Sequence, residues 1–395
     1  MKQAHADRKI LIVNQSAQFG GAEVYLIDIV DILLQAGCQI TILLCNDDIP
    51  DALRKGLASR NVQTIKQNFG VWKPDAILYN RRFAKLLDQV APDIVFFNRT
   101  GGWGKFSDLI PTARLKRISR LVSVEHYHPP PFPIRLKQPV RTVRNLAYCR
   151  FQGRCLDAII CMSAAARDIF TNKKYAYSQD KLHVIYNGID TDKFRFDAAL
   201  REVSRKLLDV SERTVVLFCG RLSEEKGPQV LIEAWGLLSE AEREKLFLLV
   251  IGDGGMKKQL EDKIEHLNLC DSVSIKGFQE NPLDYLCACD IFVLPSLEES
   301  FGISLAEAMA TGRYAIATKV GGIPELLPDA TKGTLINPNA PEQLAETIRK
   351  AAENPEYRRV TGAAAEQHVR ACFAVEKTKA ETLRVILGEA NTRTP

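Results

Sequence analysis

Two glutamates with a fixed spacing stand out in the stretch PSLEESFGISLAEAMATG, which follows an apolar, strand-like run. A helix that starts near Gly302 would leave Glu299 in the preceding loop and carry Glu307 inside the helix, so both carboxylates could reach one cavity. The N–H groups of Phe301, Gly302 and Ile303 would then point at an anion or a sugar oxygen. The alternative is structural, with Glu307 on a solvated helix face and Glu299 near the positive end of the helix dipole.

Two cations follow another strand-like run, in the stretch GRLSEEKGPQ. Gly220 allows a sharp turn, Arg221 is a permanent cation, and Lys226 lies just before Pro228, which suits the first position of a helix. Two cations beside a helix N-terminus could hold a diphosphate without a metal ion. The alternative is a pair of surface salt bridges between these cations and the glutamates that separate them.

Two smaller signals lie in the first half of the chain. Gly20 and Gly21 stand between the first strand and the first helix, where paired glycines let a backbone approach a ligand closely. His126 closes a strand in VEHYHPPPFP, and a histidine at the carboxyl end of a strand would project toward the ligand cleft. The alternative is a histidine with no role in ligand binding. The chain has no GxGxxG and no GxxxxGK[ST], so nicotinamide and P-loop chemistry are disfavoured. The GDGG turn at 252–255 is more simply structural.

Strands that alternate with helices must position these residues. Apolar runs predict strands at Lys9–Val13, Ile40–Cys45, Asp93–Phe97, Ile118–Glu125, Ala158–Met162, His183–Tyr186, Val215–Cys219, Leu246–Ile251, Ser272–Lys276, Ile291–Leu294 and Ala315–Thr318. Periodicity predicts helices at Ala22–Gln35, Pro228–Leu238, Met256–Leu267, Ile303–Ala310, Pro341–Ala352, Glu356–Cys372 and Val375–Leu387. This alternation is typical of parallel sheets covered on both faces. In such sheets ligands bind beyond the carboxyl ends of the strands, where the candidate residues stand.

The length of 395 residues predicts two domains of comparable size. We expect two doubly wound α/β domains that face each other across a cleft, with the connection near residues 190–212. The predicted domains are residues 1–195 and 196–373, and a helix within 374–395 would cross back to the first domain. Hydrophobic residues make up 46% and charged residues 26%, which excludes a disordered chain and a disulfide-built miniprotein.

The charge is unevenly distributed, which indicates an anionic partner for the first half. Residues 1–195 carry 29 Lys and Arg against 17 Asp and Glu, a net +12 within a total of +5. Residues 114–154 alone hold ten of these cations and one acid, mixed with apolar residues, as a segment lying on an anionic membrane would. A solvated helix face is the alternative, and nucleic acid is disfavoured because no binding module accompanies the charge. We find neither a signal peptide nor a spanning segment, and expect a cytoplasmic protein.

With these motifs the chain resembles a GT-B glycosyltransferase of the retaining GT4 family, the glycosyl transferases group 1. The family's E-x7-E element matches Glu299 to Glu307, and GRLSEEKG matches its Arg/Lys phosphate site. NGIDTDKF (Asn187–Phe194) matches its junction motif, and GGIPEL (Gly321–Leu326) matches a later loop.

The resemblance implies roles for the donor-side residues. Glu307 would hold the ribose hydroxyls of a nucleotide-sugar donor, and Glu299 would contact the sugar hydroxyls, helped by the backbone at Phe301 and Gly302. Arg221 and Lys226 would bind the diphosphate and stabilise its charge as it leaves.

The remaining implied roles concern the first domain. Gly20 and Gly21 would line the cleft near the diphosphate and the acceptor, and His126 would lie near the C6 hydroxyl of the donor sugar. The Asp190-Thr191-Asp192 run resembles a DxD metal site only superficially, since it belongs to the junction motif, so no metal is expected.

The function expected from this resemblance is transfer of a hexose from a UDP- or GDP-linked donor with retention of configuration. The acceptor would be lipid-linked or a polysaccharide, as in lipopolysaccharide biosynthesis, at the inner face of the membrane. A soluble small-molecule acceptor is an alternative. A nucleotide-sugar epimerase on the same fold and a non-catalytic scaffold in a polysaccharide assembly complex are two others.

Overall fold

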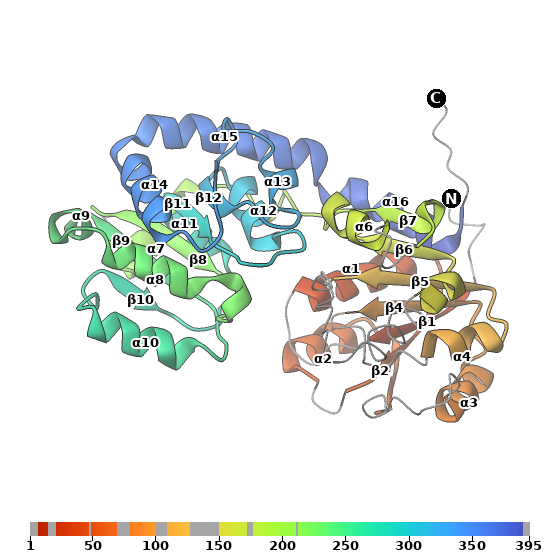
Figure 1. Ribbon diagram of the computed structural model, residues 1–395. Coiled ribbons are helices and arrows are strands. Elements are labelled where there is room, and N and C mark those ends of the chain that lie inside the picture. Colours follow the sequence, from red (N-terminus) through yellow and green to blue (C-terminus); the bar gives the residue numbers. More distant parts are fainter. Residues whose placement is uncertain are drawn as a thin grey trace, which may run out of the picture. The chain divides into compact units, whose positions relative to one another are not determined.

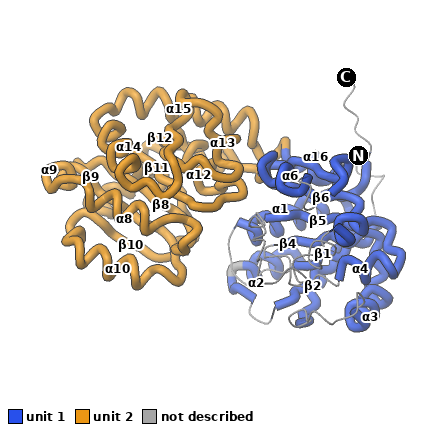
Figure 2. Tube along the Cα trace, in the orientation of Figure 1, with its two compact units in different colours: residues 1–186, 378–395 blue, residues 187–377 orange. Residues whose placement is uncertain are grey.

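Parallel strands alternating with helices form two units along the chain. The computed structural model describes residues 7–14, 21–46, 49–68, 80–99, 109–126, 150–171, 177–210 and 212–389. The first unit comprises residues 1–186 and 378–395, and the second comprises residues 187–377 (Figure 2). Each unit has its own parallel sheet.

The first unit is built on a seven-stranded sheet in the order β3-β2-β1-β4-β5-β6-β7. Its strands are β1 (Lys9–Asn14), β2 (Gln39–Leu44), β3 (Gln63–Lys66), β4 (Ile94–Arg99), β5 (Arg120–Glu125), β6 (Ala158–Cys161) and β7 (Leu182–Val184). Its helices are α1 (Gly21–Gln35), α2 (Asp51–Ala58), α3 (Arg81–Val90), α4 (Leu109–Leu115), α6 (Ala164–Thr171) and η1 (Gln179–Lys181). The central strands are buried along almost their whole length, because helices cover both faces of a parallel sheet.

The second unit has a six-stranded sheet in the order β10-β9-β8-β11-β12-β13. Its strands are β8 (Thr214–Cys219), β9 (Leu246–Ile251), β10 (Val273–Ile275), β11 (Ile291–Leu294), β12 (Tyr314–Thr318) and β13 (Thr334–Ile336). Its helices are α7 (Ala198–Leu207), η2 (Glu224–Lys226), α8 (Pro228–Gly236), α9 (Glu240–Glu244), α10 (Lys257–His266), α11 (Leu283–Ala288), α12 (Ile303–Ala310), α13 (Ile323–Leu326), α14 (Pro341–Glu353) and α15 (Pro355–Cys372). Helices α8 and α10 lie on one side of this sheet, and α12 and α15 lie on the other (Figure 1).

Both sheets reverse their strand order at one point. The reversal lies between β1 and β4 in the first unit and between β8 and β11 in the second. Loops on the two sides of such a reversal diverge to opposite faces and open a crevice beyond the carboxyl ends of the strands. The predicted class of two doubly wound α/β domains is therefore confirmed, and the candidate residues after β8 and β11 lie at a reversal.

The division of the chain comes earlier than predicted. The second unit begins at Asn187, so the boundary at residue 195 and the connection at 190–212 were placed too late. The reason is an ion-pair cluster: Arg201 and Arg205 of α7 bind the carboxylate of Asp290 at 2.6 and 3.1 Å. These contacts attach the polar segment that looked like a linker to the amino end of β11, a central strand of the second sheet.

The last helix, α16 (Val375–Leu387), contributes its residues from Thr378 onward to the first unit. The Arg120 guanidinium donates to the carbonyls of Val385 at 2.7 Å and Ile386 at 3.0 Å. Arg8 reaches the carbonyl of Leu387 at 3.4 Å. The final carbonyls of a helix have no partner within the helix and carry partial negative charge, so two arginines suit this end.

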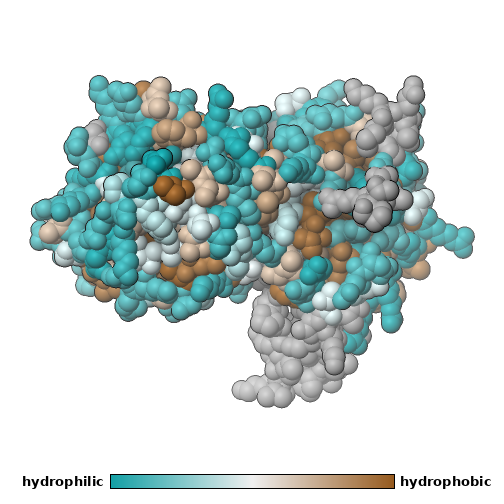
Figure 3. Space-filling model, turned by 90° about the horizontal axis from the view of Figure 1, so that it is seen from above, coloured by the Kyte–Doolittle hydropathy of each residue, from teal (hydrophilic) through white to brown (hydrophobic). Residues whose placement is uncertain are grey.

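The basic stretch predicted to meet an anionic surface is described only in part, because its residues 127–149 lie outside the described ranges. Three of its described cations bind groups of the protein. Arg114 pairs with Asp157 at 2.7 Å, Lys116 pairs with Asp88, and Arg120 holds α16. No helix in the described ranges has the length and hydropathy to cross a bilayer. The face drawn in Figure 3 is mostly hydrophilic with separate apolar patches.

Candidate functional site

Close backbone packing shapes the loop after β8, which carries Arg221. Gly252, in the loop after β9, has a φ of +142°, and a Cβ there would lie 1.8 Å from the carbonyl oxygen of Gly220. Gly220 in turn donates its N–H to the carbonyl of Ile251 at 3.0 Å. The GDGG turn is therefore structural, as predicted, and it holds the backbone beside Arg221.

A second close approach joins the η2 segment to the loop after β11. Gly227 turns the chain from η2 into α8 with a φ of +70°, and a Cβ on it would lie 2.0 Å from the carbonyl oxygen of Pro295. The N–H of Leu297 donates to the carbonyl of Glu225 at 2.8 Å. These contacts bring the predicted cation loop and the predicted carboxylate loop together.

Lys226 and Glu299 form the central ion pair of this site. The ammonium group of Lys226 lies 2.6 Å from Oε2 of Glu299, with the two side chains only 26% and 10% exposed. The other carboxylate oxygen of Glu299 accepts the N–H of Ser300 at 3.1 Å. The alternative of salt bridges with the intervening glutamates applies only to Arg221, whose guanidinium lies 3.9 Å from Glu225 and stays 43% exposed.

Helix α12 begins where the sequence predicts. Gly302 is its N-cap in the left-handed region with a φ of 99°, so Glu299 lies in the loop and Glu307 in the helix. The Glu307 side chain is partly buried, and no hydrogen bond or ion pair is found for its carboxyl group within the described ranges. Burial raises the pKa of Glu307 from 4.5 to about 7, and the positive charge of Lys193 opposes that rise. Lys193, from the NGIDTDKF motif, is a charge near this site that the sequence reasoning did not single out.

At the start of α12, one side chain packs in the core, and two backbone N–H groups are available as hydrogen-bond donors. The Phe301 ring is buried, with its centroid 5.5 Å from that of Phe373, so its side chain belongs to the core. The N–H groups of Gly302 and Ile303 bond to no backbone carbonyl in the part of the chain that the structure describes. They therefore remain available donors at the positive end of the helix.

In the first unit, His126 follows β5 and joins a chain of buried amides. Its Nε2 lies 2.8 Å from Oδ1 of Asn98 on β4, and Asn98 donates to Oδ1 of Asn14 on β1 at 2.9 Å. The ring of Tyr25 packs edge-on at 4.9 Å. Burial lowers the pKa of His126 from 6.5 to about 3, so the imidazole is neutral near pH 7. Sequence reasoning found His126 but missed both asparagines, whose signal was a polar residue in an apolar strand.

A buried ion pair lies at the same edge of the first sheet. Arg99 at the end of β4 donates to Oε1 of Glu125 at 3.0 Å, and both side chains are less than 10% exposed. Ser123 also donates to that oxygen at 2.7 Å. Of the predicted glycine pair, Gly21 is the exposed first residue of α1, and Gly20 lies outside the described residues.

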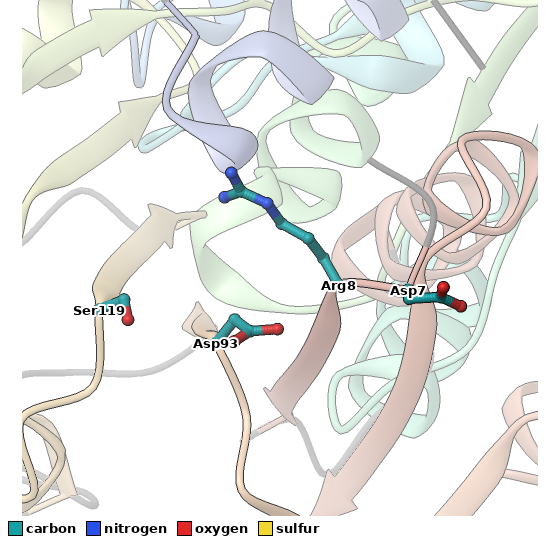
Figure 4. Close-up of a pocket in the computed structure, with 4 residues that line it drawn as sticks. All are labelled: Asp7, Arg8, Asp93 and Ser119. Carbon is teal, nitrogen blue, oxygen red and sulfur yellow. The ribbon is translucent and has the colours of Figure 1, made fainter. Parts of the chain in front are cut away.

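A surface hollow in the first unit is lined by Asp7, Arg8, Asp93 and Ser119 (Figure 4). These residues precede β1, β4 and β5, so the hollow lies at the amino ends of the strands. The candidate residues lie beyond the carboxyl ends, and the hollow is therefore separate from them.

Two family models match the chain. The model described as Glycosyl transferases group 1 matches residues 201–368, and the model described as Glycosyltransferase Family 4 matches residues 19–193. The first match contains the four predicted donor-site residues, Arg221, Lys226, Glu299 and Glu307. Residues 201–368 form a domain of the group 1 glycosyltransferases. The chain's resemblance to that family, inferred from the E-x7-E element, is thereby confirmed.

The chain is also similar to curated proteins and to solved structures. It is 29% identical over 203 residues to alpha-D-kanosaminyltransferase of Streptomyces kanamyceticus, a match covering 51% of this chain and 52% of the relative. The chain thus spans about half the length of the curated relatives it matches. Anabaena Alr3699/HepE in complex with UDP has a TM-score of 0.80 at 23% identity, covering 96% of this chain and all of that one. WaaG, a glycosyltransferase involved in lipopolysaccharide biosynthesis, has a TM-score of 0.73 at 19% identity, with 96% and 100% covered. These likenesses show the GT-B fold.

Proposed function

We propose that this protein transfers a hexose from a nucleoside diphosphate sugar to a lipid-linked or polysaccharide acceptor. The observation that carries the proposal is the charged cluster of the second unit. Lys226 and Glu299 pair at 2.6 Å beyond the carboxyl ends of neighbouring strands, and Arg221 stands exposed on the same loop as Lys226. Cations beside carboxylates can bind the two unlike parts of such a donor, a diphosphate and a hydroxyl-rich sugar.

The roles follow from charge. Arg221 and Lys226 bind the diphosphate and stabilise the negative charge that grows when the anomeric C–O bond breaks. Glu299 accepts hydrogen bonds from sugar hydroxyls, and Glu307 accepts them from the ribose. Removing one such preorganised donor costs about 3–4 kcal/mol of barrier in enzymes that stabilise an anion in this way.

UDP is the first nucleotide to test, because the HepE structure named above is a complex with UDP. GDP-linked donors are the second. We propose that the reaction retains the anomeric configuration and needs no metal, since the two cations supply the charge that a metal ion would. No three His, Cys, Asp or Glu side chains among the described residues gather to hold a metal ion.

The acceptor is proposed from the charge of the first half and from the likeness to WaaG, a glycosyltransferase involved in lipopolysaccharide biosynthesis. A net +12 over residues 1–195 favours an anionic surface, and the protein would act at the cytoplasmic face of the membrane. Sedimentation with vesicles of anionic and of neutral lipid tests this. Binding to anionic vesicles that is abolished by salt supports the proposal. Equal binding to both kinds of vesicle, or binding to neither, contradicts it.

Thermal unfolding with a panel of UDP-, GDP-, ADP- and CDP-sugars, with a chelator present, tests the donor site. A ligand at 100 times its Kd adds about 2.7 kcal/mol to the native state. We expect one nucleotide class to stabilise the wild type and not Glu307→Ala. Release of the nucleoside diphosphate together with glycosylation of an added acceptor then tests transfer. Donor converted to an altered sugar without acceptor would indicate an epimerase, and no stabilisation by any donor would indicate a scaffold.

A further inference from the structure

Three polar residues lie side by side at one edge of the first sheet. Strands β1, β4 and β5 are neighbours in the sheet order (Figure 1). Asn14, Asn98 and His126 stand at or just beyond their carboxyl ends. Both asparagines are at most 1% exposed. Buried side-chain amides in folded proteins are generally hydrogen-bonded, so each of these two amides should have defined partners.

The direction of each hydrogen bond can be deduced from one fixed partner. The Nδ2 of Asn98 lies 3.3 Å from the carbonyl oxygen of Ala22 and 2.9 Å from Oδ1 of Asn14. A backbone carbonyl can only accept, so the side-chain nitrogen of Asn98 must face Ala22. Its oxygen Oδ1 then faces His126 at 2.8 Å, and it too can only accept. The hydrogen in that contact therefore belongs to Nε2 of His126.

We propose that Asn98 is a positioning residue that holds His126 as the Nε2–H tautomer and so makes Nδ1 a hydrogen-bond acceptor. A neutral imidazole carries one N–H, and the group bonded to that nitrogen selects the tautomer. Asn14 supports the arrangement by accepting from Asn98. The edge-on ring of Tyr25, 4.9 Å away, holds the plane of the imidazole.

This tautomer determines the kind of ligand group that His126 can meet. An unprotonated Nδ1 accepts a hydrogen bond from a hydroxyl group and has no proton to offer a phosphate or carboxylate oxygen. Any group that hydrogen-bonds to Nδ1 must therefore be a donor, as a sugar hydroxyl is. Only the contact of His126 with a sugar during transfer rests on the proposed function. The tautomer itself is a property of the protein without ligand.

Nitrogen NMR of the full chain labelled with 15N-histidine tests the tautomer. The chain has six histidines, and the signal that disappears in His126→Gln identifies the residue. We expect a protonated Nε2 and an unprotonated Nδ1 near pH 7. In Asn98→Ala the two forms should mix, whereas Asn80→Ala should leave the signal unchanged, because Asn80 caps α3 by accepting from Phe83 at 3.0 Å. A protonated Nδ1 in the wild type would overturn the proposal, even if Asn98→Ala failed to fold.

A double-mutant cycle tests whether Asn98 acts through His126. We expect Asn98→Ala to lower kcat/KM by about tenfold, the effect of one lost hydrogen bond. In the His126→Ala background the same change should have no further effect, because the residue it positions is gone. Additive losses would show a general structural role and overturn the proposal. If no transfer occurs with any donor, the proposed function fails, while the NMR experiment still decides the tautomer.

Discussion

The ammonium group of Lys226 lies 2.6 Å from the carboxylate of Glu299, although 73 residues separate them. Lys226 follows β8 and Glu299 follows β11, and these strands are neighbours at the reversal of the second sheet. The cation that would bind a diphosphate is thus already paired. A diphosphate that binds Lys226 has to displace Glu299. The displaced carboxylate of Glu299 would then be available to the sugar.

This pairing gives opposite expectations for the two partners. Glu299→Gln should tighten the binding of UDP by about three- to tenfold, the range of a partly exposed ion pair. Lys226→Met should weaken it by about tenfold or more. Both should slow sugar transfer. Isothermal titration with UDP and chelator measures the first two effects. Equal weakening in both variants would mean that Glu299 orients Lys226 instead of competing for it.

Glu307 should make the stability of the protein depend on pH. Its folded-state pKa of about 7 exceeds the ordinary 4.5, so the folded state keeps a proton that the unfolded state releases between these values. The wild type therefore loses stability as the pH rises through this window. Glu307→Gln avoids the loss and should be up to about 3 kcal/mol more stable above pH 7, at roughly 1.4 kcal/mol per pKa unit.

Urea unfolding across this pH range measures the difference, which should vanish toward pH 4.5. Glu298→Gln, at an exposed neighbouring glutamate, is the matched control and should show no such trend. A constant difference at all pH values would contradict the assignment to Glu307. The same variant should lose stabilisation by UDP.

Gly227 should tolerate no side chain. At a φ of +70° and with Pro295 O only 2.0 Å from a Cβ position, Gly227→Ala should cost about 2–3 kcal/mol. Gly255→Ala is the matched control, since nothing lies within 4 Å of a Cβ there. Thermal unfolding compares them, and a second measurement of UDP binding should show a loss only in Gly227→Ala. Similar melting temperatures would contradict the close approach of η2 to the β11 loop.

Arg120 should hold the last helix on the first unit. Its guanidinium donates to two carbonyls of α16, at 2.7 and 3.0 Å. Hydrogen bonds from a charged donor contribute about 1.5–3 kcal/mol, so Arg120→Ala should destabilise the first unit by that amount. Hydrogen exchange over residues 378–387 should rise in this variant. Arg82→Ala, at an exposed position on α3, should leave the exchange unchanged.

Much of the fold was readable because its signals are local. Long apolar runs marked the central strands, and Pro228 and Gly302 marked the starts of α8 and α12 where the structure has them. Strands β3 and β13 were missed, because edge strands are short and β3, with the sequence QTIK, is largely exposed. The linker at 190–212 was misplaced because its ion pairs with Asp290 depend on a partner far along the chain.

The sequence by itself determined which residues could do chemistry, since Arg221, Lys226, Glu299 and Glu307 stand in motifs whose spacing is local. Only the tertiary structure decided how they are paired and protonated. The pairing of Lys226 with Glu299 depends on which strand ends meet. The raised pKa of Glu307 and the neutral state of His126 depend on burial by distant segments. Sequence spacing holds neither piece of information, because both arise when parallel strands assemble in an order different from that of the chain.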